Sequence, residues 1–286
     1  MLNKEVKIAF FGNSEFSLIV LKELKKAGVL PDLVVTTPDK PVGRKLILTP
    51  TSTKVWAQDN GIEYIEPDKL KDESFIEKIK NYNLFIVASY GKIIPKMLID
   101  MPEYKLLNIH PSLLPNYRGP SPLQEQILNN EKEVGVSIML IDEKVDHGAI
   151  VAQRKVDIKD WPIGFVALQE TLAKEGSKLL AEILPDWLKG KIKEKAQDDT
   201  KATFTKKVEK PDGFIDLFAD EYKNYLKILA YEDWPKTYFE INKADKKIRV
   251  IVKYAEWKEG KLHILRVIPE GKKEMDYKAF LLGLKS

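Results

Sequence analysis

Apolar residues in the first 190 positions form short continuous runs that alternate with segments of helical spacing. The short runs are typical of buried strands and read VKIAFFG, PDLVVTT, IEYIE, NLFIVAS and KLLNIH. The segments between them predict helices and read SEFSLIVLKELKKAG, STKVWAQDNG and DESFIEKIKNY. Strands that alternate with helices pair in parallel. The pattern therefore predicts an α/β fold with a Rossmann-like, mostly parallel sheet and helices on both faces.

The same domain is predicted to end with an antiparallel portion and a long helix. Two further apolar runs, GVSIMLID and GAIVAQRKVDI, are too close together for a helix between them, so they predict antiparallel strands. The amphipathic segment WPIGFVALQETLAKEGSKLLAEILPDWLKG then predicts a helix or helix pair that closes a first domain, 1–190. The polar segment 191–205 predicts a linker.

The C-terminal part has a different pattern. One helical segment, ADEYKNYLKILAY, precedes the β runs KTYFEI, KIRVIVKYAEW and KLHILRVI, which turn-rich sequences separate. Short strands with tight turns predict a small C-terminal β-barrel (OB-like) domain over 206–286.

Composition and charge narrow the function classes. The chain has no cysteine, which excludes disulfides, thiolate nucleophiles and cysteine-ligated metals. Residues 206–286 hold 18 Lys and Arg against 14 Asp and Glu, so they carry the whole net charge of +4. Such an excess can attract an anionic partner, although a solvated lysine-rich surface explains it equally simply. With no apolar stretch of about 20 residues, we expect a cytoplasmic protein that does not enter the membrane.

Two loops that follow strands are weaker candidates for function. Gly12 lies between the first strand and first helix, but neither G-x-G-x-x-G nor a P-loop lysine accompanies it, so it predicts only a tight turn. The proline-rich loop after the second strand, TTPDKPVGRKLILTPTSTK, carries Arg44 and Lys45. Loops at strand ends commonly carry function in α/β folds, yet an ordinary surface excursion is an equal alternative.

The strongest candidate is NIHPSLLPNYRGPSPLQ, where an apolar strand ends on Asn108 and His110 and opens into a loop with four prolines. Residues two apart on a strand point to the same face. An amide and an imidazole side by side can both donate hydrogen bonds to one developing oxyanion. Asp142 and Asp146, near the end of a later strand, are both candidates to orient the imidazole, and a capping asparagine with a buried core histidine is the structural alternative.

This stretch, followed by GVSIMLIDEKVDHGAIVAQ, resembles the formyltransferases that use 10-formyltetrahydrofolate. The resemblance implies that Asn108, His110 and Asp146 are the catalytic residues. It implies a folate co-substrate and no metal. It also implies a folate-contacting loop and a second contact in SYGKIIP, which together comprise Ser112, Leu113, Leu114, Pro115, Tyr90 and Gly91. We further predict that the Leu114–Pro115 peptide bond is cis, because a folate loop here needs a sharp turn.

Within that family, the rest of the chain resembles the members that act on methionyl-tRNA. The resemblance rests on PDKPVGRKLILTPTSTKVWA, EDWPKTYF and VIPEGKKEMDYKAFLLG, so it extends into the C-terminal domain. It implies that initiator methionyl-tRNA is the partner of a monomeric enzyme in translation initiation. The implied tRNA contacts are Arg44, Lys45, Lys206 and Lys207. An amino sugar nucleotide as acceptor, or a non-catalytic RNA-binding protein on the same fold, are the alternatives.

Overall fold

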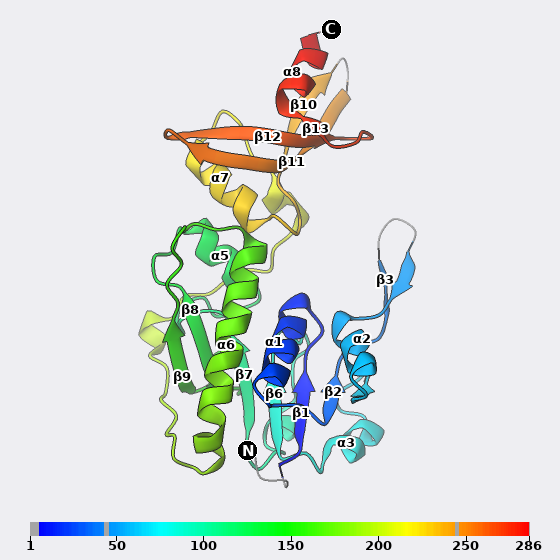
Figure 1. The fold of residues 1–286 in the computed structure, drawn as a ribbon, viewed down its shortest axis with the longest axis vertical. Helices are drawn as coiled ribbons and strands as arrows, with labels where there is room; N and C mark the ends of the chain where they lie inside the picture. The colour runs from blue at the N-terminus through cyan, green and yellow to red at the C-terminus, as the bar shows by residue number, and fades with distance from the viewer. Residues whose placement is uncertain (1–5, 43–45, 244–245, 286) are drawn as a thin grey trace. The chain divides into compact units, whose positions relative to one another are not determined.

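A computed structural model describes residues 6–42, 46–243 and 246–285 of the chain (Figure 1). The chain forms two compact units, one of 1–118, 133–157 and 169–204, the other of 119–132, 158–168 and 205–286. The first unit contains a seven-stranded sheet in the order β5-β2-β1-β6-β7-β8-β9. Its strands are β1 (Ile8–Phe11), β2 (Leu33–Val35), β5 (Glu63–Ile65), β6 (Leu84–Val87), β7 (Leu106–His110), β8 (Gly135–Leu140) and β9 (Ile150–Lys155).

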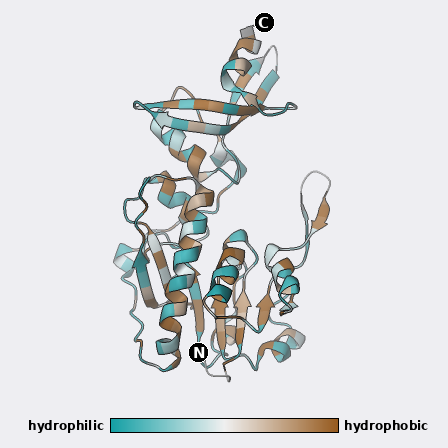
Figure 2. Ribbon diagram, in the orientation of Figure 1, coloured by the Kyte–Doolittle hydropathy of each residue, from teal (hydrophilic) through white to brown (hydrophobic). Residues whose placement is uncertain are grey.

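The pairing directions confirm the predicted sheet. Strands β5, β2, β1, β6 and β7 are parallel, whereas β8 and β9 add antiparallel pairs at one edge. Strands β1, β2 and β6 are apolar along their whole length, as Figure 2 shows by their brown colour. That composition is typical of a parallel sheet that is covered on both faces.

Helices cover the two faces of this sheet. On one face, alternate strand residues such as Phe11, Phe85 and Leu106 form a buried cluster with side chains of α3 and α4. On the other face, α6 approaches β7 so closely that a Cβ added at Gly176 would lie 2.5 Å from Ile109. The helices with most of their length in this unit are α1 (Glu15–Lys26), α2 (Ser52–Asp59), α3 (Glu73–Ile79), α4 (Lys96–Ile99) and α6 (Phe165–Leu188).

Two local features of this unit bear on the sequence interpretation. Gly12 does form a tight turn, since an added Cβ would lie 2.6 Å from the Ser17 side chain. The proline-rich loop after β2 contains a short hairpin of β3 (Lys40–Val42) and β4 (Ile47–Thr49), which the apolar pattern did not indicate. Across the described parts of the chain, no helix is both long and apolar enough to cross a bilayer.

The second unit contains the expected antiparallel β structure as a four-stranded sheet in the order β10-β11-β12-β13. Its core comprises Ile215 and Ile228 with Phe239, Val267 and Phe280 of the strands and last helix. Its elements are α5 (Pro122–Leu128), η2 (Lys210–Gly213), α7 (Glu221–Ala230), β10 (Tyr238–Lys243), β11 (Lys246–Lys258), β12 (Lys261–Pro269), β13 (Met275–Asp276) and α8 (Tyr277–Lys285).

Candidate active site

The candidate site lies at the carboxyl ends of the parallel strands. From β1 the chain builds outward through β2 and β5 on one side, then returns to form β6 and β7 on the other. In open α/β sheets, such a reversal of strand order leaves a crevice at the carboxyl ends, where ligands bind. His110 is the last residue of β7, so the topology places it at this edge.

The strand β7 holds Asn108 and His110 rigidly. Both are buried, with 8% and 4% of their surfaces exposed, and both pair with the antiparallel neighbour β8. The Nε2 atom of His110 lies 3.0 Å from the carbonyl oxygen of Tyr117. A carbonyl can only accept, so Nε2 carries the proton and donates. Only Nδ1 of the ring then remains for a ligand or a second protein group.

Asp146 is the carboxylate that faces this free nitrogen. Its Oδ2 atom lies 3.7 Å from His110 Nδ1, and its side chain is largely buried. Asp146 has a φ of 47°, in the left-handed region that favours glycine, within the turn that joins β8 to β9. Asp142 instead bonds to His147, with its Oδ2 atom 2.5 Å from Nδ1 of that ring. The geometry thus separates the two aspartates that spacing left open.

The loop 112–115 follows directly and is fastened by polar side chains of β8 and β9. Ser137 Oγ donates to the Ser112 carbonyl at 2.6 Å and accepts from the Leu114 amide at 3.0 Å. Gln153 Nε2 donates to the Leu114 carbonyl at 2.8 Å and to Ser137 Oγ at 2.9 Å. The Leu114–Pro115 peptide bond is cis, as predicted. Leu114 itself is buried, so the loop presents mainly Leu113, Pro115 and backbone groups.

The predicted second folate contact, Tyr90 and Gly91, lies after β6 at the same edge of the sheet. Tyr90 is 2% exposed and its ring packs edge-on against Phe11 at 5.5 Å. Burial raises the pKa of its phenol. Among the described residues, its hydroxyl has no hydrogen-bond partner. Gly91 has a φ of 74°, which suits glycine in a turn.

The predicted tRNA-contacting residues are in two places along the chain. Arg44 and Lys45 lie outside the described residues, in the sequence between β3 and β4. Lys206 and Lys207 are exposed and belong to the second unit. Burial raises the pKa of Glu125 in that unit, and the nearby positive charge of Lys206 partly offsets this rise. Over residues 6–42, 46–243 and 246–285, no three His, Asp or Glu side chains are grouped as metal ligands would be.

Sequence reasoning missed several residues that support the site. Ser137 and Gln153 fix the loop 112–115, the Tyr117 carbonyl fixes the His110 tautomer, and Gln197 bonds to the backbone of the Asp146 turn. Only burial of a polar side chain on a strand could have indicated Ser137, which lies opposite His110 in the ladder.

Comparisons with known proteins identify the family of the chain. The family model described as "Formyl transferase" matches residues 6–184. A methionyl-tRNA formyltransferase from Macrococcus caseolyticus is 35% identical over 98% of this chain and 96% of its own length. One from Thermodesulfovibrio yellowstonii is 36% identical, over 97% of this chain and 96% of its own. The chain belongs to the methionyl-tRNA formyltransferase family.

Solved structures show the same fold at lower identity. A methionyl-tRNA formyltransferase from Clostridium thermocellum superposes with a TM-score of 0.61, at 18% identity, over 95% of this chain and 99% of that one. A 4-N formyltransferase from Francisella tularensis superposes at 0.66 with 20% identity, over 89% and 100% of the two chains. The fold is therefore shared with solved structures that carry different formyltransferase names.

Within this family member, Gly148 makes the turn at Asp146 possible. A Cβ added there would lie 1.9 Å from the backbone oxygen of Leu140, so backbone must move. We expect Gly148→Ala to destabilise the protein by about 1–3 kcal/mol, in the range of overpacked sites. Formyl transfer should fall with it. Urea unfolding and steady-state rates measure both, with Gly283→Ala as the control, since nothing lies within 4 Å of that position. Equal stability of the two variants would contradict the tight turn.

Proposed function

We propose that this protein transfers the formyl group of 10-formyltetrahydrofolate to the free amino group of initiator methionyl-tRNA. The observation that carries the proposal is the similarity, over almost the whole chain and both compact units, to proteins named methionyl-tRNA formyltransferase. Formylation of the initiator serves translation initiation, and we expect the enzyme to be cytoplasmic and monomeric.

The reaction is acyl transfer without a covalent enzyme intermediate. The methionyl amine attacks the formyl carbon, a tetrahedral oxyanion forms, and its collapse expels the folate nitrogen. Among the described residues, no protein group forms a hydrogen bond with the side-chain amide of Asn108. Its side-chain N–H groups are therefore available to that oxyanion. His110 offers Nδ1 as the second donor when protonated, because Nε2 is committed to Tyr117.

Asp146 has two roles in this scheme, one toward the charge of His110 and one in proton transfer. A carboxylate 3.7 Å from Nδ1 stabilises the imidazolium form of His110 by Coulomb attraction. After attack, the amine must lose a proton and the folate nitrogen must gain one. The His110–Asp146 pair lies where it could carry that proton, and no other titratable pair is needed.

The co-substrate is expected to lie along the loop 112–115. That loop is rigid, since Ser137 and Gln153 hold its backbone, and little entropy is lost when a ligand binds to it. One related solved structure, from Helicobacter canadensis, is named as a complex with folinic acid and an amino sugar nucleotide, at 19% identity. It supports a folate pocket on this fold and keeps an amino sugar nucleotide as the alternative acceptor.

The direct experiment measures formyl transfer from 10-formyltetrahydrofolate to initiator methionyl-tRNA, to glycinamide ribonucleotide and to an amino sugar nucleotide. Of these three acceptors, we expect only methionyl-tRNA to be formylated. Turnover on the amino sugar nucleotide only would replace the proposed acceptor. Binding of tRNA without turnover on any acceptor would support the remaining alternative, a non-catalytic RNA-binding protein.

Arg44→Ala tests the tRNA acceptor independently of the chemistry. A guanidinium binds phosphate bidentately and stacks on unpaired bases, so its loss should raise the KM for tRNA about tenfold. Lys45→Ala should mainly flatten the salt dependence of tRNA binding, because each phosphate contact contributes about 0.9 to the slope on duplex nucleic acid. The KM for the formyl donor is the internal control. If Arg44→Ala leaves tRNA binding and formyl transfer unchanged, this loop is an ordinary surface loop that does not contact tRNA.

A further inference from the structure

The segment 195–204 lies in the predicted linker. It contacts both the loop 112–115 and the turn that carries Asp146. At its start, Lys195 exchanges two backbone hydrogen bonds of 2.8 Å with Ile150 of β9. Near its end, Thr203 accepts from the Arg118 amide at 2.9 Å and donates to the Pro115 carbonyl at 3.3 Å. We call this segment the strap. It belongs to the same compact unit as β7 and the Asp146 turn.

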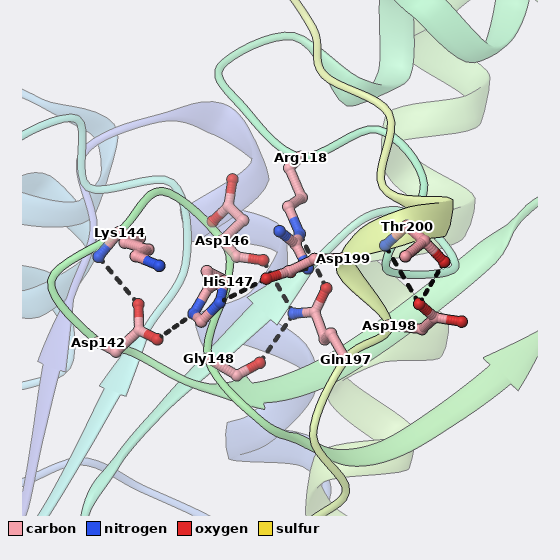
Figure 3. Close-up of polar contacts among 10 residues, drawn as sticks. All are labelled: Arg118, Asp142, Lys144, Asp146, His147, Gly148, Gln197, Asp198, Asp199 and Thr200. Carbon is pink, nitrogen blue, oxygen red and sulfur yellow. Dashed lines mark hydrogen bonds and ion pairs between the residues drawn. The ribbon is translucent and has the colours of Figure 1, made fainter.

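Gln197 is the residue of the strap that reaches the Asp146 turn. Its Nε2 atom donates to the Asp146 carbonyl at 2.9 Å and to the Gly148 carbonyl at 2.8 Å (Figure 3). Its Oε1 atom accepts from Arg118 Nε at 2.9 Å. The side-chain amide of Gln197 thus binds the carbonyls on either side of His147. One of them belongs to Asp146, whose φ of 47° is unfavourable for a residue other than glycine. These bonds fix the backbone from which the Asp146 carboxylate extends toward His110.

A chain of polar contacts that begins at Arg118 also connects the strap to this turn. Arg118 is 3% exposed and its Nη2 atom lies 2.8 Å from Asp199 Oδ1. The Arg118 guanidinium is the main reason that the pKa of Asp199 lies below its usual value. The other oxygen of Asp199 lies 3.3 Å from Nε2 of His147, the neighbour of Asp146, and Asp142 completes the chain (Figure 3). The strap therefore contacts the turn at three consecutive residues.

We propose that Gln197 is a positioning residue for formyl transfer, which sets the Asp146 carboxylate against His110 through the two carbonyls. The inference rests on the proposed function for its kinetic test. Without the Gln197 amide donor, we expect the turn to relax and the Asp146 carboxylate to move away from His110 Nδ1.

Two substitutions separate this role from a general structural one. Gln197→Ala removes all three hydrogen bonds. Gln197→Glu keeps the size and pairs more strongly with Arg118, but a carboxylate cannot donate to the two carbonyls. We expect kcat to fall about tenfold to a hundredfold in both variants. The KM for 10-formyltetrahydrofolate should stay within about threefold, because the loop 112–115 is fastened by β8 and β9 instead.

The matched control is Gln58→Ala, an exposed glutamine with a single side-chain bond to Tyr64. A second readout does not need turnover. The chain has three histidines, so ¹⁵N spectra of the imidazoles are simple, and the His110 signals are assigned by their loss in His110→Ala. We expect the Nδ1 signal of His110 to move in both Gln197 variants at fixed pH and to stay in Gln58→Ala.

The outcomes decide the proposal in either direction. Gln197→Glu with wild-type kcat and an unmoved His110 signal would overturn it, because the Arg118 contact alone would then suffice. A loss of melting temperature without a change in the His110 signal would likewise reduce Gln197 to a structural residue. If the wild-type protein formylates no tRNA, the proposed function fails, and the spectra still judge the position of Asp146.

Discussion

His110→Ala is expected to lower kcat for formyl transfer about a hundredfold to a thousandfold, the range measured for loss of one oxyanion donor. Asn108→Ala should have an effect of the same order. Both side chains are buried on one face of β7, and each offers one donor toward the same edge of the sheet. Removing either leaves the oxyanion with a single donor from these two buried side chains.

The measurement compares steady-state rates with binding of the folate co-substrate and thermal melts. Folate binding should persist in both variants, because the loop 112–115 is fixed by Ser137 and Gln153 and not by the two replaced residues. Asn83→Ala is the matched control. Asn83 precedes β6 at the opposite end of the strands, and among the described residues its side chain bonds only to the Lys7 amide. Activity within a few-fold of wild type in His110→Ala or Asn108→Ala would remove that residue from the catalytic set.

Asp146→Asn is expected to reduce kcat about tenfold to a hundredfold, as for a hydrogen bond to a charged group. The substitution keeps the size of the side chain and removes the charge that faces His110 Nδ1 at 3.7 Å. An amide in its place can no longer stabilise an imidazolium. The turn should keep its shape, because Gln197 bonds to the Asp146 carbonyl and not to the carboxylate.

Asp142→Asn provides the internal comparison. Asp142 pairs with His147 at a half-exposed position, with 38% of its side chain accessible. Exposed ion pairs contribute about 0–1 kcal/mol, so kcat should fall by no more than about fivefold. Both variants are assayed under one set of conditions with saturating folate. A larger loss in Asp142→Asn than in Asp146→Asn would mean that the wrong aspartate has been assigned to His110.

Much of the sheet could be predicted from local pattern. The continuous apolar runs of β1, β6 and β7 and the helical spacing of α1 and α6 depend on neighbours within one or two turns, which a single sequence displays. Period-two alternation likewise placed Asn108 and His110 on one face. The β3–β4 hairpin was missed, because its strands are three residues long and most of their described side chains are exposed. Nothing in such a short pattern distinguishes a hairpin from an irregular loop.

From the sequence alone, we could predict the order of the strands of the main sheet, the direction of the central strands and the shared face of Asn108 and His110. The partners that those side chains meet became known from the three-dimensional structure. Asp146 rather than Asp142 faces His110 because a left-handed residue and a crowded glycine bend the turn, and Gln197 reaches that turn from about fifty positions away. Periodicity fixes which face a strand residue occupies. Contacts between distant loops depend on the path of the backbone in space, which no local pattern records.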